Sequence, residues 1–201
     1  MMTAKNIRKA SIPGDHYFTP KWCVRQCMSI VLPIVIPKRH KQPESILEPG
    51  AGKGAFLGPL RKRYPTAEIS ALDIEPSFGP WGKANNSYEH DFLKWSIQHD
   101  LIIGNPPYTL ALAFVKKAIE LSPVVIFLVR QGFLASQKRN AFFRMNQPSD
   151  VFIISHRPSF TPDGQTDTAD YCWVCWSDDR PRDPGTSILH WLPTVSKEKR
   201  K

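Results

Sequence analysis

Cysteine is scarce in this sequence, with four residues among 201. Cys23 and Cys27 lie one helical turn apart among apolar residues, where a small buried thiol is common. Cys172 and Cys175 lie in a stretch that reads as a β-strand, and residues three apart on a strand point to opposite faces. The spacing therefore argues against a shared zinc ion, and we expect no metal site. A reducing compartment argues against a disulfide.

Long apolar runs are absent as well. No run approaches the roughly 18 residues of a membrane-spanning helix, and no signal-type apolar core follows the basic segment from Met1 to Lys9. We therefore expect a soluble, cytoplasmic protein with no membrane partner. The 201 residues, 41% hydrophobic and 22% charged, suffice for one globular domain.

Acidic residues are scarce at both ends of the chain, whose net charge is +9. Residues 1–41 hold eight Lys or Arg residues against Asp15 alone, and residues 197–201 hold four against Glu198. Basic ends on a near-neutral body indicate contact with a polyanion, although solvated termini are the alternative, which we favour for the last five residues. We divide the chain into a basic, flexible N-terminus (1–14), one folded domain (15–193) and a basic, disordered tail (194–201).

The most informative stretch is Ile102-Ile103-Gly104-Asn105-Pro106-Pro107-Tyr108. The two prolines hold Asn105 at the end of a buried strand, because proline fixes its own φ and biases the preceding residue toward extended geometry. Asn105 Oδ1 and the Pro106 carbonyl then form two fixed acceptors beside the flat ring of Tyr108. This arrangement suits a planar group with an NH₂, such as a nucleobase amine or a glutamine amide. The alternative is an ordinary proline-rich turn.

A second motif, Glu48-Pro49-Gly50-Ala51-Gly52-Lys53-Gly54, lies between a short strand from Ser45 and a helix from about Ala55 to Arg63. Glycine permits positive φ and a close approach of the backbone to a ligand. The spacing matches neither a P-loop nor the dinucleotide fingerprint, so the position between strand and helix is the evidence for a ligand site.

Acidic residues end the next two predicted strands. Asp73 lies at the carboxyl end of the strand from Glu68, where a carboxylate is well placed to accept hydrogen bonds from ribose hydroxyls. A helix or loop cap is the alternative for Asp73. Asp91-Phe92 ends a short strand from Tyr88 and could meet the edge and face of an adenine.

Strands and helices alternate along the chain. Thr19 as N-cap and Pro20 as first residue start a helix that extends to Ile36. The further expected elements are helix 109–121, strand 124–129, helix 134–145, strand 151–155, strand 171–176 and a short edge strand at 188–192. This order predicts an α/β fold with an open, mostly parallel seven-stranded sheet and helices on both faces. The predicted site residues converge at the carboxyl edge of that sheet, where ligands bind.

Two segments in the second half of the chain are candidates for substrate contacts. The helix 134–145 is polar and bears Lys138 and Arg139, and the loop from His156 to Thr168, which holds Phe160, is the only long irregular segment there. Long loops in compact domains are often functional. These groups favour contact with a nucleic-acid backbone over base readout.

Together these motifs, with Tyr17-Phe18-Thr19-Pro20, resemble the S-adenosylmethionine-dependent amino-methyltransferases over roughly residues 15 to 177. The resemblance is greatest to the DNA adenine-N6 methyltransferases, including small phage and prophage members. It implies a Rossmann-like class I methyltransferase fold, S-adenosylmethionine as cofactor and DNA as substrate in a prokaryotic or phage-infected cell. RNA is the alternative substrate.

The resemblance also implies the residues of the site. The cofactor site would comprise Tyr17, Thr19, Pro20, Glu48, Gly50, Gly52, Asp73, Asp91, Phe92 and Asn105. The catalytic residues would be Asn105, Pro106, Pro107 and Tyr108, and the substrate contacts would include Tyr108 and Phe160. The basic character of the helix 134–145 adds Lys138 and Arg139 as substrate contacts.

One departure from the family bears on specificity. The gap from Asp91 to Asn105 is too short for a target-recognition domain, and about two dozen residues follow Trp176. We therefore expect a short or relaxed target. The rivals are an RNA methyltransferase, a protein-glutamine methyltransferase, and a non-catalytic subunit with a decayed cofactor site. The target, the oligomeric state and the biological role stay open at this point.

Overall fold

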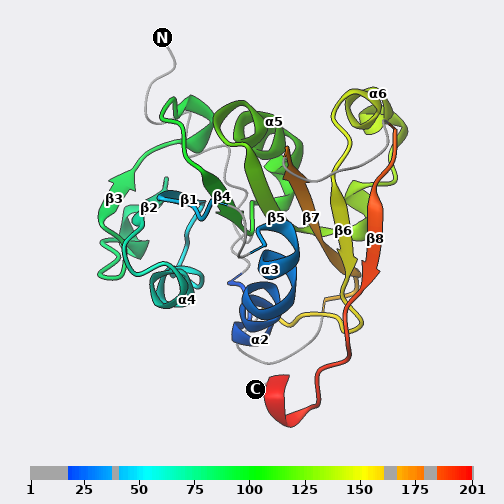
Figure 1. Cartoon of the computed structure of the whole chain (residues 1–201), viewed down its shortest axis with the longest axis horizontal. Helices are drawn as coiled ribbons and strands as arrows, with labels where there is room; N and C mark the ends of the chain where they lie inside the picture. Colours follow the sequence, from blue (N-terminus) through cyan, green and yellow to red (C-terminus); the bar gives the residue numbers. More distant parts are fainter. Residues whose placement is uncertain (1–17, 38–40, 161–166, 179–184, 201) are drawn as a thin grey trace.

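The computed structural model describes residues 18–37, 41–160, 167–178 and 185–200. Within these ranges eight strands form one sheet in the order β3-β2-β1-β4-β5-β7-β6-β8 (Figure 1). The strands are β1 (Ser45–Pro49), β2 (Glu68–Asp73), β3 (Asn86–Glu89), β4 (Leu101–Gly104), β5 (Val124–Arg130), β6 (Asp150–Ile153), β7 (Tyr171–Ser177) and β8 (Ile188–Trp191). The first five are parallel, and β7 lies antiparallel between β5 and β6. The sheet is therefore open and mostly parallel, as predicted.

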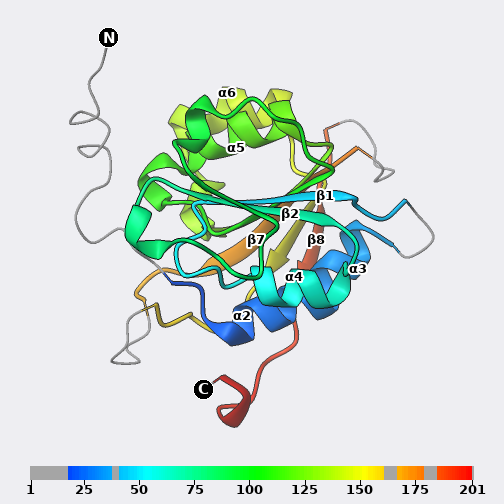
Figure 2. The same cartoon turned by 90° about the vertical axis from the view of Figure 1, so that its left-hand side faces the viewer.

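Helices cover both faces of the sheet (Figure 2). One layer holds α2 (Lys21–Gln26), a π-helical turn (Cys27–Val31), α3 (Leu32–Val35) and α4 (Leu57–Arg63). The other holds α5 (Ala111–Leu121) and α6 (Gln137–Met145). Each layer closes a separate hydrophobic core, so the central strand β5 is apolar until Arg130. No helix of the described residues is long and apolar enough to span a membrane.

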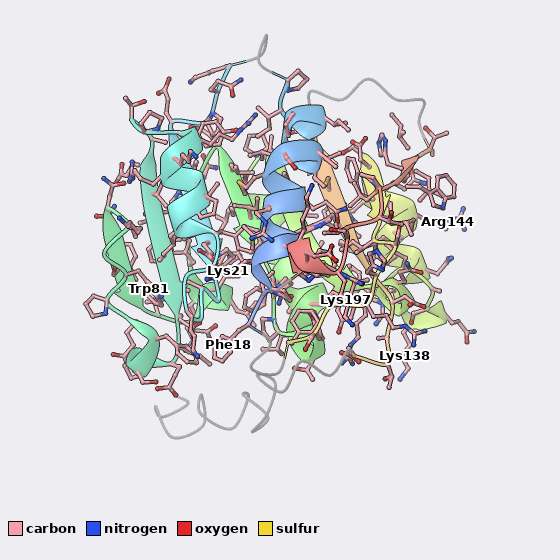
Figure 3. The ribbon with its side chains drawn as sticks, turned by 90° about the horizontal axis from the view of Figure 1, so that it is seen from below. Phe18, Lys21, Trp81, Lys138, Arg144 and Lys197 are labelled. Carbon is pink, nitrogen blue, oxygen red and sulfur yellow. The ribbon has the colours of Figure 1, made fainter. Side chains whose placement is uncertain are left out.

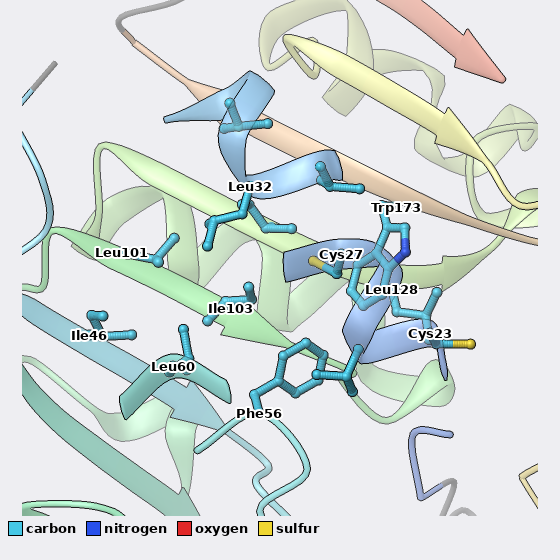
Figure 4. Close-up of a cluster of buried hydrophobic side chains, with 14 of the residues drawn as sticks. Cys23, Cys27, Leu32, Ile46, Phe56, Leu60, Leu101, Ile103, Leu128 and Trp173 are labelled. Atoms are coloured by element: carbon cyan, nitrogen blue, oxygen red, sulfur yellow. The ribbon is translucent and has the colours of Figure 1, made fainter. Parts of the chain in front are cut away.

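The four cysteines are buried free thiols inside these two cores. Cys23 and Cys27 pack with Leu32 under the first layer (Figure 4), where burial raises the pKa of both thiols. Cys175 belongs to the same core, whereas Cys172 faces the other one. The prediction that Cys172 and Cys175 lie on opposite faces of their strand is confirmed.

The helix that begins at Lys21 differs from its prediction in two respects. Its N-cap is Pro20, and no side chain caps it, so Thr19 is not the N-cap. The chain also widens into the π-helical turn before Pro33, which stands at the start of α3. Proline has no N–H to donate and its ring crowds the preceding turn, which accounts for the interruption.

Two further predictions need correction. The sheet has eight strands among the described residues and not seven, because β8 pairs in parallel with β6. The tail was expected to be disordered from residue 194, but residues 194–200 lie against α2 and end in a short helix, Glu198–Arg200. Val195 packs on the core and so holds this segment in place. The basic N-terminus (1–14) and Tyr17 lie outside the described residues.

Candidate active site

The glycine-rich turn follows β1 at the carboxyl edge of the sheet. Gly50 and Gly52 have φ of 63° and 52°, in the left-handed region that favours glycine. A Cβ on Gly50 would lie 3.8 Å from Pro107 Cδ, and one on Gly52 would lie 3.6 Å from the Phe18 ring. The turn after β1 therefore packs against the Asn105–Tyr108 motif after β4, as the common edge predicts.

Asp73 connects the end of β2 to the same turn. Its carboxylate accepts the Gly52 N–H at 2.8 Å and the Glu75 N–H at 3.0 Å, and the residue is 8% exposed. The capping alternative is thus present in the structure. A carboxylate offers about four lone-pair sites, so one that organises a turn can also accept hydrogen bonds from a ligand.

Glu48 is buried beneath the turn, with 3% exposure. The Phe56 N–H lies 3.5 Å from its Oε1, and Oε2 has no hydrogen-bond partner among the described residues. Burial raises the pKa of the Glu48 carboxyl well above its usual range, and the nearby Asp73 charge raises it further against the opposing Phe56 bond. A buried, incompletely satisfied carboxyl favours a cationic or hydrogen-bond-donating ligand group beside it.

Tyr108 anchors an aromatic cluster behind the Asn105-Pro106-Pro107 segment. Its ring packs 5.5 Å from Tyr171 and, edge-on, 6.1 Å from Phe160. Burial raises the pKa of the Tyr108 hydroxyl well above its usual range, whereas a hydrogen bond with Asn105 opposes that rise. Phe160 is only 6% exposed, so its ring supports Tyr108 and presents little surface for the substrate contact that the resemblance implies.

Arg130, at the carboxyl end of β5, is a site residue that the sequence did not reveal. Its guanidinium carbon lies 4.9 Å from the Tyr108 ring centre. The same group donates to the Tyr171 hydroxyl at 3.1 Å and to Asp167 Oδ2 at 3.0 Å. Burial pushes the pKa of Asp167 up, but hydrogen bonds from Tyr171, Ala169 and Arg130 outweigh it and lower the pKa to about 2. The group therefore ties the Asp167 loop to the central strand.

Asp91 and Phe92, for which the sequence suggested an adenine contact, lie shortly after β3. The Asp91 carboxylate accepts the Leu93 N–H at 3.0 Å and caps the short helix Phe92–Lys94. Phe92 is 1% exposed and packs 4.9 Å from Phe114. A ring buried in this way supports the site from the core and presents no face to a ligand.

Two aromatic residues that the sequence did not single out as site residues enclose the glycine-rich turn. The Trp81 indole N–H donates to the Gly52 carbonyl at 2.8 Å. Phe18 covers Gly52 from the other side, with Lys53 Nζ 4.2 Å from its ring centre. Figure 3 shows Phe18 and Trp81 at the same edge of the molecule. In the sequence, only their aromatic character could have indicated that Phe18 and Trp81 enclose the glycine-rich turn.

The predicted basic contacts on α6 divide into two kinds. Arg139 donates to the Phe133 carbonyl at 2.7 Å and to the Gly132 carbonyl at 2.8 Å, so it braces the loop between β5 and α6. Lys138 is exposed and lies toward the edge that holds Phe18 (Figure 3). Lys138 is accordingly the better placed of the two for a substrate.

No protein-family model matches the chain. One curated relative, the type II methyltransferase M.CvrRI of Paramecium bursaria Chlorella virus XZ-6E, is 40% identical over 107 residues. The match covers 50% of this chain and 26% of the viral protein. The chain therefore spans only about a quarter of the length of that relative.

Two of the solved structures that resemble this chain cover nearly all of it. A Listeria monocytogenes protein, proposed to be a class I S-adenosylmethionine-dependent methyltransferase, has a TM-score of 0.67 at 14% identity, over 98% of this chain and 72% of its own. The M protein of the type I restriction enzyme EcoKI has a TM-score of 0.60 at 12% identity, over 93% of this chain and 51% of its own. The chain has the class I methyltransferase fold, and the predicted fold class is confirmed.

Proposed function

We propose that this chain transfers a methyl group from S-adenosylmethionine to the exocyclic amine of adenine in DNA. The observation that carries the proposal is the meeting of three strand-end motifs at one edge of a class I sheet. Gly50 packs beside Pro107, and Gly52 is hydrogen-bonded to Asp73. The 40% identity to a type II methyltransferase supports methyl transfer over simple binding.

The residues around the glycine-rich turn fit this cofactor. Glu48 provides a buried carboxyl oxygen with no partner among the described residues, which suits the ammonium of the methionine moiety. Asp73 stands where ribose hydroxyls would be received. Gly50 and Gly52 keep the surface between these carboxyl groups free of side chains. When bound, S-adenosylmethionine supplies an electrophilic methyl group on a sulfonium centre.

The residues after β4 act on the target amine. The adenine amine is a poor nucleophile because its lone pair is delocalised into the ring. Asn105 Oδ1 and the Pro106 carbonyl would accept its two N–H bonds, which orients the nitrogen and concentrates the lone pair toward the methyl group.

The Tyr108 ring supplies the stacking face. A duplex buries the adenine amine, so the base must flip out before it reaches Asn105. Base–aromatic stacking contributes about 1–3 kcal/mol. Phe160, Tyr171 and Arg130 contact the Tyr108 ring and fix its orientation before the base arrives. Lys138 on α6 would contact a phosphate of the flanking strand.

Mass spectrometry of the products decides between the candidate substrates. The protein is incubated with S-adenosylmethionine and, separately, with plasmid DNA, total RNA and a protein extract. We expect N6-methyladenine in the DNA with the wild-type protein and none above background with Asn105→Ala. A product confined to RNA or to glutamine side chains would overturn the DNA assignment but keep the amine chemistry. No product in any arm would overturn methyl transfer itself.

A further inference from the structure

The C-terminal segment 192–200 runs along α2, although the two are far apart in the sequence. Gln26 donates from its side chain to the Pro193 carbonyl at 2.9 Å, and the Arg25 guanidinium donates to the Lys199 carbonyl. Leu192 is 3% exposed and belongs to the core beneath α2. These contacts hold both ends of the segment against the last turn of α2.

This contact joins the two basic parts of the chain into one surface. Lys21 and Arg25 are exposed on α2, and Lys197 and Lys199 are exposed on the segment beside it. We call these four residues the basic face. Glu198 is the one acid within 192–200, and the first turn of α2 has none. Like charges repel, so a surface of this kind is stable only where solvent or a bound anion screens it.

The basic face lies next to the candidate active site. Phe18, which covers Gly52, is three residues before Lys21, so the start of α2 borders the glycine-rich turn. Figure 3 shows Lys21 and Lys197 on the side of the molecule that carries α2. Lys138 lies closer to the edge that holds Phe18. A long polyanion that lies across α2 would therefore pass beside the glycine-rich turn.

We infer that the basic face binds the phosphate backbone of duplex DNA beside the target adenine. This inference rests on the proposed function, and it adds the surface that holds the substrate. Lysine and arginine on a convex helix face have no shape that reads base edges, so they contribute affinity without sequence information. The basic face would thus position the duplex relative to the active site.

The spacing of the charges favours a duplex over a small anion. A free phosphate needs donors that converge on one point, whereas the four basic residues are all exposed and come from two different segments that contact one another. Duplex DNA carries one negative charge per about 1.7 Å of its axis, so it can meet several separate charges. Each contact releases counterions, and binding must then weaken steeply as salt rises.

The test is a charge reversal, Lys197→Glu with Lys199→Glu, measured by fluorescence anisotropy on a 30-base-pair duplex of arbitrary sequence. The loss of two phosphate contacts should lower the slope of log affinity against log salt by about 2 and weaken binding at least about ten-fold at low salt. A matched control reverses the exposed Lys62 of α4 and Lys116 of α5, with the same change in net charge. The control should leave the slope nearly unchanged.

Two more variants keep the test independent of folding. Lys197→Arg with Lys199→Arg retains the charge and should retain the slope. Glu198→Gln removes the acid of the segment and should tighten binding. An equal loss in the control and the test pair would overturn the basic face and assign the effect to net charge. Tighter binding of single-stranded RNA than of the duplex would overturn it as well.

The same measurements separate this inference from the proposed function. If the wild-type protein binds the duplex with the expected slopes but forms no methyladenine, the basic face stands and the assigned reaction fails. If it methylates DNA while Lys197→Glu with Lys199→Glu binds and methylates like wild type, the reaction stands and the basic face fails. Calorimetric binding of S-adenosylmethionine should be unchanged in every variant, which excludes general damage.

Discussion

The guanidinium carbon of Arg130 lies 4.9 Å from the centre of the Tyr108 ring, and the same side chain bonds both Tyr171 and Asp167. A planar guanidinium stacks on a ring face and donates along its edge at the same time. Arg130 therefore determines how Tyr108 is oriented relative to Asn105. We regard it as a positioning residue for the target base.

Arg130→Lys should slow methyl transfer about ten-fold or more, because a lysine cannot keep both the stacking and the two directed bonds. Binding of S-adenosylmethionine should stay within about two-fold of wild type, since the contacts of Arg130 described above lie at Tyr108, Tyr171 and Asp167. Steady-state kinetics on plasmid DNA and calorimetry check the two expectations. Arg144→Lys, an exposed arginine on α6, is the matched control. A kcat equal to that of the control would remove Arg130 from the site.

Asp167 should make stability depend on acid pH. Its folded pKa of about 2 lies below the ordinary 3.8, so its contribution is present above pH 3.8 and is lost as the pH falls toward 2. Allowing for the partly exposed Arg130, we expect about 1–2 kcal/mol. Urea unfolding at pH 7 and pH 2.5 should show a smaller loss of stability for Asp167→Asn than for wild type. Equal losses would mean that the Arg130–Asp167 bond contributes nothing.

Glu48 should couple cofactor binding to a proton. Burial raises its pKa, so the free protein favours the neutral carboxyl and loses stability as the pH rises above the ordinary 4.5. The ammonium of S-adenosylmethionine would favour the charged form, so binding should release a proton. Calorimetry in two buffers of different ionisation enthalpy detects this release. Glu48→Gln should abolish it and the exposed Glu89→Gln should not; equal release in both would place the ammonium elsewhere.

Asn105 and Asp73 should divide between target and cofactor. Asn105→Ala should abolish transfer and leave S-adenosylmethionine binding nearly intact. Asp73→Asn should weaken that binding by more than about 1 kcal/mol, since hydrogen bonds to a charged group contribute about 1.5–3 kcal/mol. Asparagine is preferable to alanine here, because the Gly52 N–H still needs an acceptor. Lost cofactor binding in a folded Asn105→Ala protein would contradict this division.

Much of the site could be predicted because its residues are local to strand ends. Glycine, proline and carboxylates mark the carboxyl ends of β1, β2 and β4, and a parallel sheet brings those ends together without further information. The meeting of Gly50 with Pro107 follows from topology alone. The interpretation of residues 171–176 as a strand was enough to place Cys172 and Cys175 on opposite faces.

The residues that the sequence did not reveal depend on contacts between distant segments. Nothing beside Arg130 in the sequence indicates Asp167 or Tyr108 as its partner, because the loop that carries Asp167 returns to β5 only through the antiparallel strand β7. The tail looked disordered because its charges dominate its composition. Its anchors, Leu192 and Val195, are single apolar residues, which carry too little signal to predict packing.

The last prediction concerns target sequence. Base-edge contacts specify a sequence, whereas phosphate contacts only position the protein. Among the described residues, the basic face and Lys138 are suited to phosphate contacts, and the loop residue Phe160 packs against Tyr108. We therefore expect methylation of adenine in a short or relaxed sequence context. Sequencing of methylated adenines on a mixed plasmid after treatment measures this directly. A strict target of about five or more defined bases would contradict it, because each defined base pair needs about 1–3 kcal/mol of discrimination that these groups do not supply.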